Sequence, residues 1–178
     1  MDLSKFTDRS RGFIQSAQTI ATRENHQGLM PEHILKALMD DDQGLASNLI
    51  NSAGGDSNTV LGHVEEALSK LPKVTGNAAQ VYLDKSTAKV LAEAESLAKK
   101  ADDSFVPVER VLMALGMVSS GAKKALEAGN VTPNALNTAI NGIRKGRTAD
   151  NDNAEQAYDA LKKYATDLTE RAKEGKID

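Results

Sequence analysis

The chain has 178 residues, 40% of them hydrophobic, and this size allows one substantial core but not two large ones. The formal charge of -3 and the three scattered Phe and three Tyr residues offer neither the basic surface nor the stacking platform of a nucleic-acid-binding protein. Cysteine is absent, which excludes disulfides, thiolate metal sites and a cysteine nucleophile. The first residues do not resemble a signal peptide and no stretch is long enough to span a membrane, so we expect a cytoplasmic protein without a membrane partner.

The same helical unit occurs twice in the chain, with its apolar and turn residues in matching order when the sequence is shifted by 77 positions. The matching pairs include Ile14 with Leu91, Leu35 with Leu112, Glu32 with Glu109, Gly44 with Gly121 and, after one deleted residue, Val60 with Leu136 and Val64 with Ile140. Composition alone rarely aligns charged and turn residues as well as apolar ones. A duplicated half-domain is therefore the best explanation of the sequence.

The first copy is predicted to form four helices. Apolar residues recur at helical spacing after Thr7, a typical N-cap residue, and Pro31 suits the first turn of the second helix. The expected helices span residues 7–24, 31–38, 43–52 and 57–71, the last one capped by Asp56 or Ser57. Residues 73–81 are polar and contain a glycine, so they are expected to connect the two copies.

The same order of signals returns in the second copy. Asp84 or Ser86 is expected to cap the fifth helix, and Pro107 begins the counterpart of the second. Gly129 ends the seventh helix, while Thr132 marks the start of the eighth. No alternating strand pattern of useful length occurs, so all regular structure is expected to be helical.

The residues after the second copy form a different kind of segment. Residues 146–153 are polar and rich in turn residues, which predicts a flexible linker that adds nothing to the core. From residue 154 onward, apolar positions such as Ala157, Leu161 and Leu168 form one stripe of an amphipathic helix. We expect this helix to dock poorly, because the chain holds no further domain to cover its stripe.

The predicted fold is all-α, with two pseudo-repeats of four helices each, a flexible linker and a C-terminal amphipathic helix. Repeat one is expected at residues 1–76, repeat two at 77–145, the linker at 146–153 and the truncated start of a further segment at 154–178. Because each repeat covers the other, we expect the 178-residue chain to be a monomer.

Several short segments resemble a known family. Phe6–Ser10, Pro31–Leu38 and Val108–Leu115 resemble the duplicated Clp N-terminal domain. Ala160–Ala172 and Gly175–Asp178 resemble the segment that leads into the first ATPase module of ClpB-type AAA+ disaggregases. The repeat segments are shared across Clp ATPases, whereas the tail favours the disaggregase branch over the protease-coupled branch.

The resemblance implies a substrate-binding N-terminal module of an ATP-dependent, hexameric disaggregase, which works with the Hsp70 chaperone system and engages unfolded or aggregated polypeptides. The alternative is an adaptor- or substrate-docking domain of a protease-coupled Clp ATPase. The chain contains no Gly-x-x-x-x-Gly-Lys-[Ser/Thr] phosphate loop, so it should neither bind nor hydrolyse ATP. ATP and Mg are expected in the missing modules of the parent, and this fragment is expected to be neither an enzyme nor a cofactor-binding protein.

The resemblance also implies six candidate substrate-binding residues, which are Thr7, Glu32, Leu91, Asp103, Glu109 and Arg110. Thr7, Asp103 and Glu109 match positions that matter to chaperone activity in ClpB relatives. Glu32 is the repeat mate of Glu109, and such residues engage positively charged or phosphoarginine-bearing substrates in protease-coupled relatives. Leu91 and the neighbourhood of Arg110 are the nearest candidates in this sequence for the apolar groove that takes up unfolded chains in ClpB relatives.

These candidates also have simple structural explanations. Thr7 suits the cap of a helix, and acidic residues such as Asp103 and Glu109 complement the dipole at a helix start. Leu91 falls on a core stripe, which favours a buried position. Arg110 has an aliphatic stem that suits an apolar wall.

The three histidines are not expected to form a metal site. His26, His33 and His63 belong to separate elements with no carboxylate at ligand spacing, so surface or capping roles are favoured. His33 is answered by Arg110 in the second copy, so only the first copy keeps a Glu-His pair, which weakens a phosphoarginine-binding role. No Ser, His and Asp set has the spacing of a nucleophilic triad, which argues against catalysis.

Overall fold

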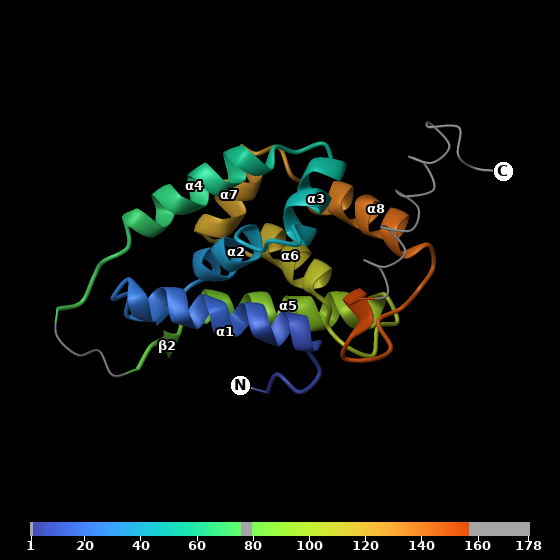
Figure 1. Ribbon diagram of the computed structural model, residues 1–178, viewed down its shortest axis with the longest axis horizontal. Coiled ribbons are helices and arrows are strands. Elements are labelled where there is room, and N and C mark those ends of the chain that lie inside the picture. The colour runs from blue at the N-terminus through green and yellow to red at the C-terminus, as the bar shows by residue number, and fades with distance from the viewer. Residues whose placement is uncertain (1, 76–79, 157–178) are drawn as a thin grey trace.

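The computed structural model describes residues 2–75 and 80–156, which form packed layers of helices (Figure 1). In chain order the elements are α1 (Asp8–Arg23), β1 (Gly28–Leu29), α2 (Pro31–Met39), α3 (Leu45–Ser52), α4 (Ser57–Ser69), β2 (Tyr82–Leu83), α5 (Lys85–Lys100), α6 (Val108–Met117), α7 (Gly121–Ala128) and α8 (Pro133–Arg144). The predicted pattern of four helices in each copy is confirmed. Residues 157–178, the body of the predicted C-terminal amphipathic helix, lie outside the described part of the chain.

Four helices begin at side-chain caps that the sequence predicts. These caps are Thr7 for α1, Asp56 for α4, Asp84 for α5 and Thr132 for α8. In each case a side-chain oxygen accepts a hydrogen bond from a free amide of the first helical turn. Local sequence signals are therefore sufficient to place these helix starts.

The two repeats match element by element, with one residue deleted in the second copy. α5 and α6 begin 77 residues after α1 and α2, whereas α7 and α8 begin 76 residues after α3 and α4. The deletion therefore lies before α7, and Gly44, the N-cap of α3, corresponds to Ser120. The sequence-based match of Gly44 with Gly121 is wrong by one residue, because the chain shortens in the turn between α6 and α7.

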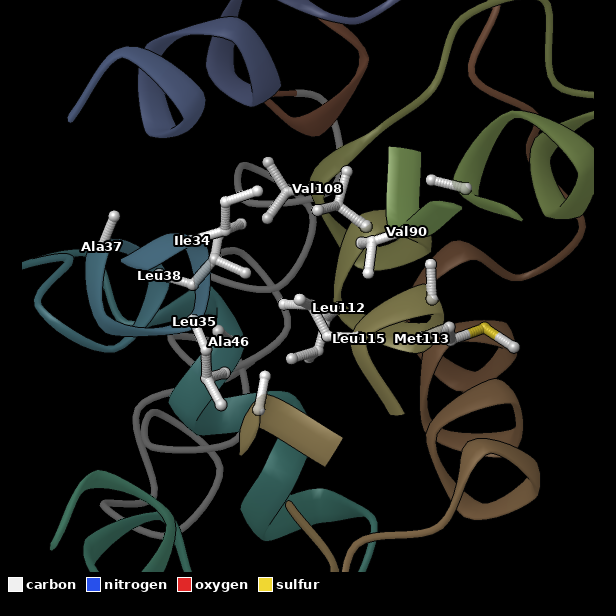
Figure 2. Packing of buried hydrophobic residues seen from close by; sticks show 14 of the residues in the cluster. Ile34, Leu35, Ala37, Leu38, Ala46, Val90, Val108, Leu112, Met113 and Leu115 are labelled. Carbon is white, nitrogen blue, oxygen red and sulfur yellow. The ribbon is translucent and has the colours of Figure 1, made fainter. Parts of the chain in front are cut away.

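Two helices, α2 and α6, form the centre of the fold. α2 packs on α1 and α4, and α6 packs on α5, α7 and α8. Every α6 residue from Val108 to Gly116 is buried, as are all α2 residues except Lys36. Figure 2 shows Leu35 of α2 and Leu112 of α6 among the side chains that fill the core. Because these helices have no face in water, their polar side chains need partners inside the protein.

The repeats are joined by exchanged strand pairs. β1 pairs with β2 in parallel, with Leu29 opposite Leu83, and an isolated parallel bridge joins Phe6 to Val106. Leu29 and Val106 are 77 residues apart, as are Phe6 and Leu83, so the two pairings are mates under the internal symmetry. In addition, α4 packs on α7 and α3 packs on α8. Each repeat therefore completes the core of the other.

Residues 146–153, predicted as a linker without core residues, pack on the repeats. Ala149 is fully buried beside Ala154. Its carbonyl oxygen accepts hydrogen bonds from the amides of Ser104 and Phe105, at 2.9 and 3.0 Å. The prediction is therefore wrong at Ala149, because one small apolar residue within the polar run fits against the loop before α6. The domain boundaries themselves stay a prediction.

The contact between α4 and α7 depends on a glycine. A Cβ atom at Gly129 would lie 2.4 Å from Cγ2 of Val60 and 3.0 Å from the carbonyl oxygen of Asp56. We therefore expect Gly129→Ala to lower the free energy of unfolding by about 1–3 kcal/mol through overpacking. Gly62→Ala, on the open side of α4, is the matched control and should raise it by about 1 kcal/mol through helix propensity. Urea denaturation measures both, and an unchanged midpoint for Gly129→Ala would contradict the close approach.

Candidate functional site

Polar residues from separate segments meet beneath the surface at the N-terminal ends of α1 and α6. We refer to them as the polar cluster, which consists of Thr7, Asp103, Glu109, Arg110, Arg144 and Glu155. None of them exposes more than 9% of its surface. Four of the six are candidates that the sequence predicts, so the structure brings most of the candidate site together.

Arg144, the last residue of α8, bridges two carboxylates of the polar cluster. Its Nη1 donates to both oxygens of Asp103 at 2.8 and 2.9 Å, while Nε and Nη2 donate to Oε1 of Glu109 at 2.8 and 2.6 Å. A planar guanidinium suits such multiple hydrogen bonds. Asp103 Oδ1 also accepts the Ala149 amide at 2.8 Å. The centre of the cluster is therefore a buried network of ion pairs.

Burial and charge act against each other within this network. Burial raises the pKa of Glu109 above its ordinary value, the charge of Arg144 opposes this shift, and the carboxylate of Glu155 adds to it. For Arg144, burial by itself lowers the pKa, but Glu109 and Asp103 outweigh that effect and the pKa lies above its ordinary value. Arg144 therefore stays charged, and its charge is needed to hold buried carboxylates.

Arg110 points into the protein, with only 4% of its surface exposed. Its Nη1 donates to Asn137 Oδ1 at 3.0 Å and lies 3.1 Å from the Met113 sulfur. Its Nε lies 3.6 Å from Oδ2 of Asp103. Arg110 thus connects α6 to α8 and to the loop after α5, and it presents little surface to a ligand.

The hydroxyl group of Thr7 forms hydrogen bonds with two residues, Ser10 and Glu155. The oxygen accepts the Ser10 amide at 3.1 Å, which confirms the predicted cap of α1. The hydroxyl also donates to Oε2 of Glu155 at 2.5 Å, and the Val108 amide at the start of α6 donates to the same oxygen at 3.0 Å. Glu155 thus joins the starts of two helices that belong to different repeats.

The remaining two candidates occupy other places. Leu91 is a core residue of α5 with 3% exposure, as its position on an apolar stripe suggests. Glu32 of α2 is buried, and its carboxyl group lies at the start of α7. A Cβ atom on Gly121 would lie 2.9 Å from the Cδ of Glu32. Burial raises the pKa of Glu32, and hydrogen bonds from the amides of Ala122 and Gly121 oppose the shift. A substrate contact by any of the six candidates stays a prediction, and their burial favours the structural explanation for each.

Sequence reasoning missed two members of the polar cluster. Arg144 does carry a signal, because it follows Leu136 and Ile140 at intervals of four residues on the inward stripe of α8. A charge on an apolar stripe indicates a buried ion pair. Glu155 gives no such signal, because its partner Thr7 is 148 residues away in the chain.

Two histidines meet inside repeat one, contrary to the expectation that each takes a separate surface or capping position. Nδ1 of His26 and Nε2 of His33 lie 2.8 Å apart, and both rings are buried. His33 does cap α2, since its Nδ1 accepts the Met30 amide at 2.9 Å. This bond leaves the His33 proton on Nε2, facing Nδ1 of His26. A shift of 77 residues relates His26 to Asp103 and His33 to Arg110, so the histidine pair is the repeat mate of part of the polar cluster.

A surface hollow of about 400 Å³ lies next to the polar cluster. It is bounded by the N-terminal segment at Lys5, by Ser96 and Lys99 of α5, and by Asp103 and Val106 in the loop before α6. A ligand can approach Asp103 of the cluster from solvent at this hollow. It offers both apolar walls and charged side chains.

Within residues 2–75 and 80–156, no three or more His, Cys, Asp or Glu side chains are grouped so that they could hold a metal ion. The same ranges contain no helix with the length and apolar character needed to cross a membrane.

The histidine pair makes stability depend on pH. Burial lowers the pKa of His33 from 6.5 to about 4, and His26 adds to the shift. Between these values the unfolded chain binds more protons than the folded one, so stability falls as the pH falls, by about 3 kcal/mol at most. His33→Asn keeps an acceptor for the Met30 amide but takes no proton, so the stability of this variant should fall less as the pH falls from 6.5 to about 4. His63→Asn, at an exposed histidine, is the control, and an unchanged pH dependence of urea unfolding in His33→Asn would refute the assignment.

Arg144 should be required for stability. Arg144→Leu leaves Asp103 and Glu109 buried without their main counter-charge and should lower the free energy of unfolding by about 3–5 kcal/mol. Arg147→Leu removes the same charge three residues later at an exposed position and should change stability by less than about 0.5 kcal/mol. Chemical denaturation compares the two variants, and equal losses would show that the network is not stabilised through Arg144.

Comparisons with known proteins agree with the duplicated fold. Over its whole length the chain is 57% identical to the chaperone protein ClpB of Rhodopseudomonas palustris and 56% identical to that of Rhizobium meliloti. It spans 20% of the length of the first relative and 21% of the second. The Hsp104 N-terminal domain from Candida albicans has a TM-score of 0.75 at 21% identity, covering 84% of this chain and 98% of that one. The N-domain of ClpV in complex with a VipB peptide has a TM-score of 0.63 at 18% identity, and the match covers 84% of this chain and 95% of that one. The Clp repeat (R) N-terminal domain family matches residues 5–128, and the chain therefore belongs to this family.

Proposed function

We propose that the chain is the substrate-binding N-terminal module of an ATP-dependent protein disaggregase, whose hexameric parent acts in the cytoplasm with the Hsp70 chaperone system. The observation that carries the proposal is the 57% identity with a ClpB chaperone over the whole chain. The weaker alternative is a docking domain of a protease-coupled Clp ATPase. It is weaker because the relatives from Rhodopseudomonas palustris and Rhizobium meliloti are both ClpB chaperones.

In this proposal the chain contributes binding and no motor chemistry. The sequence contains no phosphate loop, and the chain spans only 20% of the ClpB relative from Rhodopseudomonas palustris. ATP and Mg therefore belong to the rest of the parent. The module would hold unfolded or aggregated polypeptides close to the hexameric motor, with no part for nucleic acid or membranes.

The polypeptide contact is proposed at the hollow beside Asp103. Asp103 lines this hollow together with Ser96 and Lys99, while the other members of the polar cluster are buried beneath the surface. A volume of about 400 Å³ is enough for one or two side chains of an extended polypeptide. Apolar burial is not directional, which suits a site for many different clients. The ClpV N-domain complex with a VipB peptide supports peptide binding by this fold.

A ring that fills the hollow should reduce binding. Ser96→Tyr is expected to weaken binding of a carboxymethylated, permanently unfolded polypeptide by about fivefold, or about 1 kcal/mol. Ser69→Tyr adds the same ring beside a different hollow, between α1, α2 and α4, and should leave the affinity unchanged. The measurement is an amide NMR titration of the 178-residue chain without nucleotide.

Shifts that gather around Lys99 and Ser104 would support the proposed surface. Equal affinities of Ser96→Tyr and the unaltered chain would place the contact elsewhere. A lack of shifts with any unfolded polypeptide would refute substrate binding by this module altogether.

A further inference from the structure

Residues 147–156, here named the strap, run from the end of α8 to the start of α1 (Figure 1, orange to red). The Asp8 amide donates to the carbonyl oxygen of Asp152 at 2.8 Å, and the amides of Ser104 and Phe105 donate to that of Ala149. The strap is therefore held at several points by both repeats. Its last anchor is a side chain, that of Glu155.

Glu155 occupies a site with two convergent donors. The hydroxyl of Thr7 and the amide of Val108 both reach Oε2 of Glu155, and only 1% of this residue is exposed. We name these two donors the carboxylate socket. α6 has Pro107 at its N-cap position and no cap side chain of its own, so Glu155 supplies the missing acceptor from outside the helix.

The place that the internal symmetry relates to the socket cannot hold a carboxylate. Thr7 corresponds to Asp84 and Val108 corresponds to Pro31 under the shift of 77 residues. Asp84 would repel a second carboxylate, and Pro31 has no amide hydrogen to donate. The socket between the starts of α1 and α6 is therefore not a general product of the repeated fold.

Docking of Glu155 is opposed by the charges around it. With Glu155 in place, the polar cluster holds three carboxylates and only two guanidinium groups, those of Arg110 and Arg144. Within the described residues, Oε1 of Glu155 and Oε2 of Glu109 are buried without a hydrogen-bond partner. The excess charge and the unpaired oxygens oppose docking, whereas the two socket bonds favour it. Such a balance suits a contact that opens and closes.

We propose that Glu155 is a latch, which holds the strap on the repeats when it occupies the carboxylate socket and frees the strap when it leaves. The repeats stay folded in both states, because their core lies in α2, α6 and the helices packed on them. Since the strap precedes residue 157, the latch decides whether the following chain leaves the repeats at a fixed place. This inference goes beyond the proposed function and does not depend on binding of a polypeptide.

Amide hydrogen exchange of the 178-residue chain tests the latch directly. In Glu155→Ala the amides of Asp8, Ser104 and Phe105, which donate to the strap, should exchange about tenfold faster or more, while amides of α2 keep their rates. Gln156→Ala, at the exposed neighbour in the same strap, is the matched control and should change none of them.

A second pair of variants separates the socket from the cap of α1. Thr7→Asp keeps a good helix cap but removes the hydroxyl donor and repels Glu155, so it should accelerate the same amides as Glu155→Ala. Thr7→Ser keeps the hydroxyl and should leave the rates unchanged.

Unchanged exchange at Ser104 and Phe105 in both Glu155→Ala and Thr7→Asp would overturn the latch. Equal acceleration of the α2 amides in Glu155→Ala would also overturn it, because Glu155 would then stabilise the whole fold. Neither outcome involves a polypeptide ligand, so failure of the latch is distinguishable from failure of the proposed substrate binding.

Discussion

The burial of α2 and α6 on all sides determines where the polar groups of this protein must go. The first turn of any helix has amides without partners inside the helix, and a buried helix cannot leave them to water. Repeat one meets this requirement within its own sequence: Pro31 has no amide hydrogen, and His33 turns back to the Met30 amide. Repeat two meets it with Glu155, a residue from beyond its last helix.

The same constraint has two different solutions at equivalent positions of the repeats. His26 and His33 form a pair whose rings are neutral near pH 7, whereas their mates Asp103 and Arg110 are charged. Charges in the interior need counter-charges, and Arg144 supplies one at the position where α4 carries Leu68. The internal symmetry thus holds for the backbone and the apolar core, while the buried polar chemistry differs between the halves. The buried ion pairs of repeat two lie beside the strap, which contacts both repeats.

Local patterns explain most of what the sequence could predict. The sequence predicts the Thr7 cap correctly because the cap, the amide whose hydrogen bond it accepts and the apolar stripe all lie within a few residues. The second bond of the same hydroxyl, to Glu155, could not be predicted, because nothing near Thr7 in the sequence depends on it. The two-residue strands and the contact of His26 with His33 could not be predicted for the same reason, since they form only after the chain has packed. Ala149 shows the limit of composition, because an alanine within a polar run is fully buried and accepts hydrogen bonds from the loop before α6.

The order of synthesis matters for a fold whose halves exchange partners. The hydroxyl of Ser10 donates to the carbonyl of Val106, 96 residues later, and that of Thr87 donates back to Leu29. A nascent chain that has released only repeat one lacks these partners, and α2 would have an uncovered apolar face. Contacts of such long sequence separation form slowly, because the entropy of closing a long loop must be overcome before they stabilise the chain. We therefore expect the whole duplicated domain to be the smallest cooperative folding unit. Half of it, released early from the ribosome, would itself expose the kind of surface that chaperones bind.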